Sequence, residues 1–196
     1  MKRIALTLLA VTALPSCLSA RQAPLPAETQ IALAVQAAPE DRREDATVQG
    51  TLPNGDFAVL RAGTNDLVCM APNPAAEQFE VSCHSASLEP FFERGRELRA
   101  QGIDGIERVQ ARYREFEAGS LPIPTGTTNY ILTGSGFDPA TSEIQDPYLR
   151  WVVYLPNATP ETTGLSVRAR ANAPWLMFPG TPGAHIMITP PRAGGG

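Results

Sequence analysis

The chain has 196 residues, and its 16 Lys and Arg against 20 Asp and Glu give a formal net charge of −4. No basic cluster stands out, so nucleic-acid binding has no electrostatic basis. Neither a G-x-G-x-x-G run nor a P-loop occurs, and no cofactor is predicted. Hydrophobic residues make up 43% of the chain, an ordinary share for a globular protein, which argues against extensive disorder.

The first segment, residues 1–20, has the three parts of a bacterial signal peptide in the expected order. Lys2 and Arg3 precede an uncharged apolar run of eleven residues, 4–14, which Pro15 breaks. As a helix this run would extend roughly 16 Å, about half of the hydrocarbon core of a bilayer. The segment is therefore too short to span a membrane. We expect the mature protein to work outside the cytoplasm, in the periplasm or at the outer membrane.

The processing of this segment has two interpretations. Residues 14–17, Leu-Pro-Ser-Cys, resemble the lipobox of bacterial lipoproteins, in which the cysteine, here Cys17, is acylated and becomes the first residue. The alternative is ordinary cleavage after Ser19 or Ala20. Only acylation would attach the protein to a membrane, through its lipid anchor.

Residues 21–45 are predicted to form a tether and a short helix, 28–38, that ends at a proline. The expected apolar face of this helix consists of Ile31, Val35 and Ala38. Four short strands follow, separated by turn residues such as Asn-Gly. They are predicted at 47–52, 57–60, 67–70 and 79–83.

Two helices are predicted after these strands. Ser87 is expected to cap the first helix and Gly102 to end it, while Asp104 with Glu107 resembles a capping box and Gly119 ends the second. An apolar stripe is expected on the second helix at Ile106, Val109, Tyr113 and Phe116. A solvated outer face is expected at Arg108, Arg112, Arg114, Glu115 and Glu117.

The last third of the chain returns to strands, and residues 191–196 are expected to be a flexible tail. These strands are predicted at 129–133, 148–155, 165–169, 175–178 and 184–189. The pattern indicates an α+β fold, with short antiparallel strands flanking a central two-helix segment, in a single domain over residues 46–190.

Cys69 and Cys83 are the cysteines that remain when Cys17 is removed or acylated. A pair in an oxidising compartment is most simply a disulfide, which would join two neighbouring strands or a strand and its loop. The rival interpretation is a reactive thiol or a metal ligand. The disulfide would close a loop of about 15 residues and stabilise the fold by about 3 kcal/mol.

Candidate chemistry centres on the two histidines, His84 and His185. With a carboxylate such as Asp138 they could form a metal site, although no close His-x-His spacing supports it. The turn at 179–185, with two prolines and two glycines, could hold the His185 imidazole in one orientation for general-base catalysis. It could equally route the backbone between two strands, with the imidazole bonded to a carbonyl group.

Several short stretches resemble a group of exported bacterial proteins that have no established activity. Asp66, Leu67 and Val68 depart from the pattern, in which a Gly-Trp-Thr-like run precedes the cysteine. The resemblance implies secretion and little chemistry. The stretches that carry it are 37–39, 46–48, 60–65 running to Cys69, 173–177 and 179–187.

We therefore expect an exported envelope protein that binds a small molecule or a partner protein of the envelope. The alternative is a periplasmic hydrolase or metal-dependent enzyme that uses His185.

Overall fold

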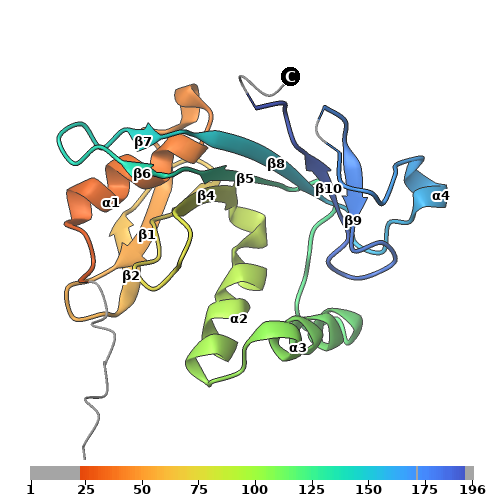
Figure 1. Cartoon of the computed structure of the whole chain (residues 1–196). Coiled ribbons are helices and arrows are strands. Elements are labelled where there is room, and N and C mark those ends of the chain that lie inside the picture. The colour runs from red at the N-terminus through yellow and green to blue at the C-terminus, as the bar shows by residue number, and fades with distance from the viewer. Residues whose placement is uncertain (1–22, 171, 193–196) are drawn as a thin grey trace, which may run out of the picture.

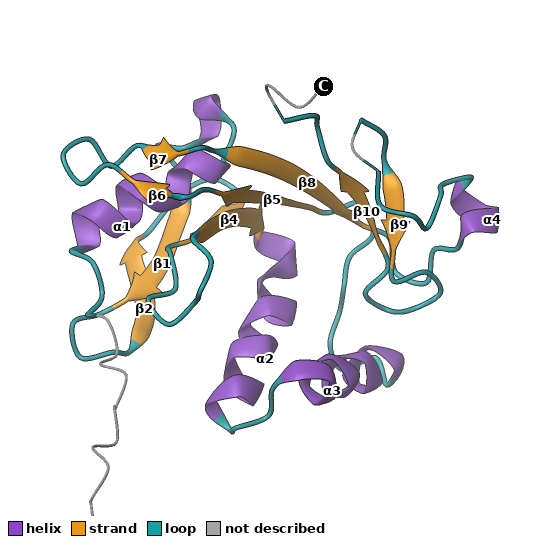
Figure 2. Ribbon diagram, viewed as in Figure 1, coloured by secondary structure: helices purple, strands orange, loops and turns teal. Residues whose placement is uncertain are grey.

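A computed structural model describes residues 23–170 and 172–192. It confirms the α+β fold, with a mostly antiparallel sheet and a central pair of helices (Figures 1 and 2). The predicted signal peptide, Cys17 and residues 193–196 of the predicted tail lie outside the described residues. Within the described part of the chain, no helix is both long enough and apolar enough to cross a bilayer.

The helical segments are mostly short. They are α1 (Ala27–Ala34), η1 (Val35–Ala37), η2 (Glu40–Arg42), η3 (Ala86–Leu88), α2 (Glu89–Ala100), α3 (Gly105–Glu117) and α4 (Pro160–Thr163). The strands are β1 (Thr47–Thr51), β2 (Phe57–Arg61), β3 (Leu67–Met70), β4 (Glu80–Ser85), β5 (Thr128–Thr133), β6 (Gly136–Phe137), β7 (Ile144–Gln145), β8 (Tyr148–Tyr154), β9 (Trp175–Met177) and β10 (His185–Ile188).

Eight strands form one sheet in the order β2-β1-β3-β4-β5-β8-β10-β9, and β6 pairs with β7 in a separate hairpin. Of the strand pairs in the sheet, β1 and β3 are parallel and the others are antiparallel. The order places β2 and β9 at the two edges. Each edge strand exposes backbone groups that can pair with another chain.

The sheet carries a hydrophobic cluster on each face, because successive side chains of a strand point to opposite sides. On β4, Val81 and Cys83 pack with Leu33 and Ala34 of α1. The neighbouring His84 faces the other side, where it contacts Glu89 and Phe92 of α2. Figure 1 shows α2 and α3 below the sheet on this second side.

The first helix is shorter than predicted, and its most buried side chains differ in part from the predicted ones. It ends at Ala34, continues as the 3-10 turn η1, and gives way to an extended backbone at Ala38. A residue before proline avoids the helical conformation, which explains the break at Ala38. Of the predicted face, Ala38 is buried as expected, while Ile31 and Val35 are only partly buried. The other buried positions follow the spacing of one helical face and are Gln30, Leu33, Ala34 and Ala37.

The predicted ends of α2 and α3 are mostly confirmed. Gly102 has φ +82° and Gly119 has φ +75°, the left-handed conformation in which glycine commonly ends a helix. The Asp104 carboxylate accepts a hydrogen bond from the Gly105 backbone at 2.8 Å and caps α3. The Ser87 cap was wrong, because Ser87 lies inside η3 and its hydroxyl bonds to that of Ser85 instead.

The predicted outer face of α3 was wrong for Arg112. Its guanidinium lies 4.1 Å from the centre of the Phe91 ring, and Gly95 of α2 leaves room for it. Desolvation by this burial lowers the pKa of Arg112. The predicted apolar stripe of α3 was wrong for Ile106, whose side chain is 70% exposed.

One predicted strand is not a strand. Residues 165–169 have no regular secondary structure, and the carbonyl oxygen of Ser166 accepts a hydrogen bond from the Leu176 backbone of β9 at 2.8 Å. A single hydrogen bond does not make a ladder, but it partly occupies this edge of the sheet. The β6–β7 hairpin and α4 were not predicted, since each is a very short segment among turn residues.

Gly183 is required by the packing of α3 against the loop before β10. A Cβ atom at this position would overlap the hydroxyl group and ring of Tyr113. We therefore expect Gly183→Ala to lower the free energy of unfolding by about 1–3 kcal/mol, measured by urea denaturation. In a Tyr113→Ala background the same substitution should cost much less. Additive effects of the two substitutions would contradict this contact.

Candidate functional site

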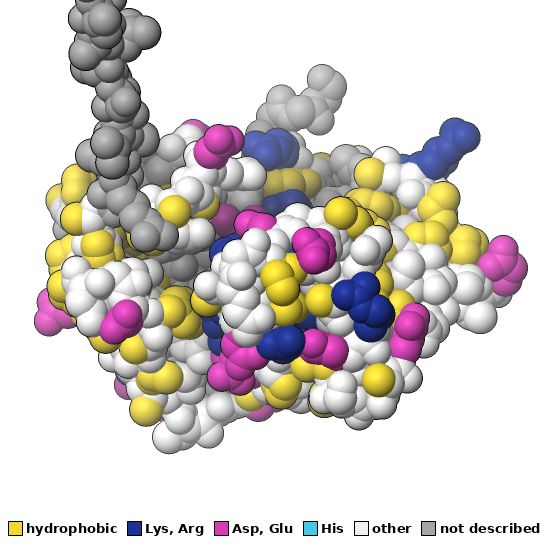
Figure 3. Space-filling view, turned by 90° about the horizontal axis from the view of Figure 1, so that it is seen from below, with side chains coloured by type: hydrophobic (Ala, Val, Ile, Leu, Met, Phe, Trp, Pro, Cys, Tyr) yellow, Lys and Arg dark blue, Asp and Glu magenta, His cyan; other side chains and the backbone are white. Residues whose placement is uncertain are grey.

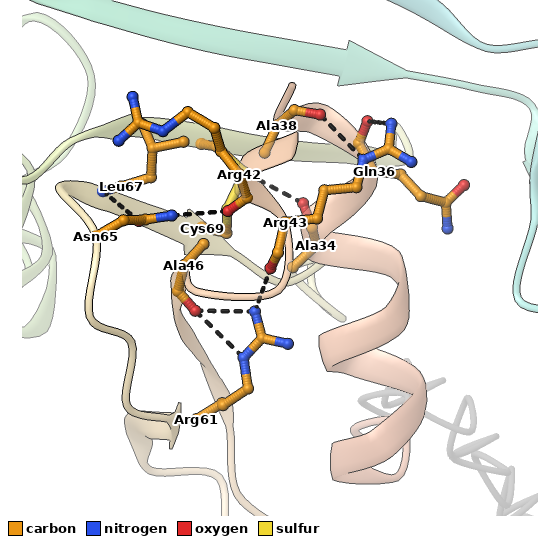
Figure 4. Close-up of a disulfide and its surroundings, with 11 residues drawn as sticks. Ala34, Gln36, Ala38, Arg42, Arg43, Ala46, Arg61, Asn65, Leu67 and Cys69 are labelled. Carbon is orange, nitrogen blue, oxygen red and sulfur yellow. Dashed lines mark hydrogen bonds between the residues drawn. A yellow bond between two sulfur atoms is a disulfide. The ribbon is translucent and has the colours of Figure 1, made fainter. Parts of the chain in front are cut away.

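The predicted disulfide between Cys69 and Cys83 is confirmed, and it lies in the hydrophobic cluster on the α1 side of the sheet. The two residues are directly opposite on β3 and β4, with Cα atoms 4.0 Å apart, and both are 0% exposed. Figure 4 shows the segment after α1 held close to it by arginine side chains. Arg43 donates to the Ala38 carbonyl oxygen at 3.0 Å, and Arg61 donates to that of Ala46 at 2.9 Å. The bridge is therefore sealed from solvent.

On the opposite face, His84 takes part in a buried polar network with the first turn of α2. Its Nε2 atom lies 2.7 Å from Oε2 of Glu89, and its ring stacks on Phe92 with 4.3 Å between centroids. Glu89 also accepts hydrogen bonds from Gln49 of β1, at 2.8 Å, and from Arg96 of α2. One carboxylate thus joins β1, β4 and two turns of α2.

The charge on Glu89 is stabilised by these partners. Burial alone would raise its pKa, but the hydrogen bonds from His84 and Gln49 and the Arg96 guanidinium outweigh burial and lower the pKa to about 2. The carboxyl group is therefore ionised at neutral pH. The His84 side chain is 0% exposed, which suits a residue that fixes α2 on the sheet better than one that meets a substrate.

His185 lies at the start of β10 and is only 8% exposed. Its Nδ1 atom lies 2.7 Å from the Gly183 carbonyl oxygen, an acceptor, so Nδ1 carries the proton. The rings of Tyr154 and Phe178 lie 5.4 and 5.6 Å away between centroids. Burial lowers the pKa of His185, so the imidazole is neutral at pH 7. The constrained turn does hold the imidazole in one orientation, but the ring is enclosed by aromatic neighbours.

The structure does not bring the predicted metal ligands together. His84 and His185 lie on β4 and β10, with β5 and β8 between them, which separates them by about 14 Å. Asp138 lies in the β6–β7 hairpin, where its carboxylate accepts from the Ala140 backbone at 2.7 Å. Among residues 23–170 and 172–192, no three His, Cys, Asp or Glu side chains are grouped to hold a metal ion.

A groove of about 410 Å³ lies between the edge strand β2 and helix α2, and we call it the β2–α2 groove. Phe57 and Val59 line its floor and are 43% and 55% exposed. The Arg96 guanidinium lies 4.9 Å from the centre of the Phe57 ring, so the Glu89 network reaches the groove directly. The remaining lining residues are Gln49, Ala58, Glu89, Glu93, Glu97 and Ala100.

The sequence did not point to this groove. Its members come from β1, β2 and α2 and are brought together only by sheet order and by the position of α2. The one local signal was the apolar run at 57–60 in a strand that proves to be an edge. Figure 3 shows that acidic and basic side chains are interspersed on the α2–α3 face, without a large area of one sign.

Comparison of the chain with protein-family models, with curated proteins and with solved structures finds no significant match.

Proposed function

We propose that this chain is an exported bacterial envelope protein that acts by binding a partner protein. The buried Cys69–Cys83 disulfide is the observation that supports export most directly. Both sulfur atoms lie inside a hydrophobic cluster between adjacent strands, so the bond must form before or during the closing of that cluster. Stable disulfides are typical of oxidising compartments such as the periplasm.

The sequence of residues 1–20 supports the same location, because a basic start, a short apolar run and small residues near the end are the features of an export signal. Anchoring through an acylated Cys17 is the part of the proposal that depends on the Leu-Pro-Ser-Cys stretch alone.

The binding role rests on the exposed surface of the β2–α2 groove. It combines exposed apolar side chains with an open strand edge, and these are features of sites that other proteins occupy. By contrast, His84 and His185 are buried and engaged in contacts that fix neighbouring elements.

Cell fractionation combined with thiol alkylation tests the export proposal. We expect the protein in the envelope fraction without Met1, starting either at an acylated Cys17 or after Ser19 or Ala20. Cys69 and Cys83 should react with the alkylating reagent only after reduction. Full-length protein in the cytosol with both thiols free would overturn the proposal.

A further inference from the structure

The two edges of the sheet differ in how they are protected. At β9 the backbone of Leu176 is already bonded to Ser166, outside the sheet. At β2 no described strand pairs with the outer side, and residues 57–60 carry no charge. Natural proteins usually guard an open edge with charges, proline or a covering segment. The β2 edge is therefore the more accessible one.

The hydrogen bonds of β1 show which backbone groups of β2 face outward. The Gln49 carbonyl oxygen accepts from Ala71, on the side of β3, and the backbone of Thr51 bonds to the Gln30 side chain. Neither residue therefore uses these groups to bond β2. Their partners in the register are Val59 and Phe57. In an antiparallel pair, residues that do not bond each other direct both backbone groups away, so Phe57 and Val59 present theirs to solvent.

The charges that line the groove favour a basic partner at the β2 edge. On the α2 wall of the groove, Glu89 is paired with Arg96, whereas Glu97 shares Arg94 with Glu115. Glu93, which also lines the groove, is exposed and forms no ion pair with any described residue. The groove thus has exposed apolar side chains and a net negative charge, because Glu89, Glu93 and Glu97 line it with Arg96 as the basic lining residue.

From these features we infer that the β2–α2 groove binds an extended, basic segment of a partner protein, which adds a strand to β2. Its backbone would pair with Phe57 and Val59, its apolar side chains would cover these two residues, and a lysine or arginine would face Glu93. Such strand addition draws affinity from main-chain hydrogen bonds and specificity from alternate side chains. The inference rests on the proposed binding function and names the class of partner.

The test uses a short synthetic peptide that alternates valine and lysine, and a second peptide in which glutamate replaces lysine. Calorimetry should show binding of the first and at least roughly tenfold weaker binding of the second. Hydrogen exchange should slow at the amides of Phe57 and Val59 when the first peptide is present. Equal affinity for both peptides, or no protection of these amides, would overturn the inference.

Variants of the groove distinguish strand addition from nonspecific hydrophobic binding. Val59→Pro removes the outward N–H without removing a bond to β1, and should abolish binding. Val59→Thr keeps that N–H and a β-branched side chain, and is the matched control that should still bind. Glu93→Lys should reverse the preference between the two peptides. Thermal melting checks that each variant is folded, and binding by the proline variant would contradict strand addition.

Two other results would also be decisive. A dimer through β2, detected by analytical ultracentrifugation and abolished by Val59→Pro, would mean that a second copy occupies the edge, and it would overturn the basic partner segment. If the valine–lysine peptide does not bind but the protein is exported and its disulfide is formed, strand addition alone is refuted. Export and oxidation are measured by fractionation and alkylation, independently of peptide binding.

Discussion

Glu89→Gln should lower the free energy of unfolding by about 2–3 kcal/mol, because it leaves Arg96 without a counter-charge and replaces the carboxylate that His84 contacts. The partial exposure of Glu89 keeps the expected loss below that of a fully buried pair. Urea unfolding at neutral pH measures it. Glu93→Gln, on the same helix but exposed, is the matched control and should change stability by less than about 0.5 kcal/mol.

The same substitution should change how stability depends on pH. The folded-state pKa of Glu89 is about 2, below the ordinary value of 4.5, so the unfolded chain binds the proton more readily. The contribution of Glu89 is therefore complete above about pH 4.5 and is lost as the pH falls towards 2. The glutamine variant should lose this part of the acid sensitivity. Parallel stability curves of the two proteins across that range would show that Glu89 is not the responsible group.

Removal of the disulfide should have the second large effect. Replacing both Cys69 and Cys83 with alanine should cost about 3 kcal/mol, since the bond closes a loop with a sequence separation of 14. For a chain of this size the midpoint of thermal unfolding should fall by roughly 6–12 °C. Scanning calorimetry with and without reductant measures the shift.

The double variant supplies its own control, because reductant should lower the midpoint of the native protein and leave that of the variant unchanged. If the native protein melts at the same temperature in both conditions, the disulfide does not stabilise the fold.

The sequence predicted the elements whose pattern is local. Strands such as β1, β5 and β8 follow from apolar residues between turn residues, and Gly102 and Gly119 mark helix ends by their conformational freedom. The disulfide was predicted from two cysteines in a chain whose first residues are predicted to be an export signal. These signals need no knowledge of where distant segments lie.

The rest depends on tertiary contacts. Arg112 looked like a solvated residue because its helix position is polar, and only the glycine at position 95 on another helix allows it to lie over Phe91. His84 was considered as a possible metal ligand because it is one of two histidines in the chain. The sequence does not show that its partner is the Glu89 carboxylate. The β2–α2 groove requires the sheet order, which strand patterns do not determine.

The position of the disulfide has a consequence for folding. Cys83 and His84 are neighbours on β4 that serve opposite faces, so a slip of this strand by one residue would exchange a sulfur atom for an imidazole in the hydrophobic cluster. The bond to Cys69 fixes the pairing of β3 with β4 and makes that slip impossible. Oxidation therefore acts as a check on alignment: a bridged chain has β4 correctly placed for both faces at once, whereas a reduced chain remains free to misalign.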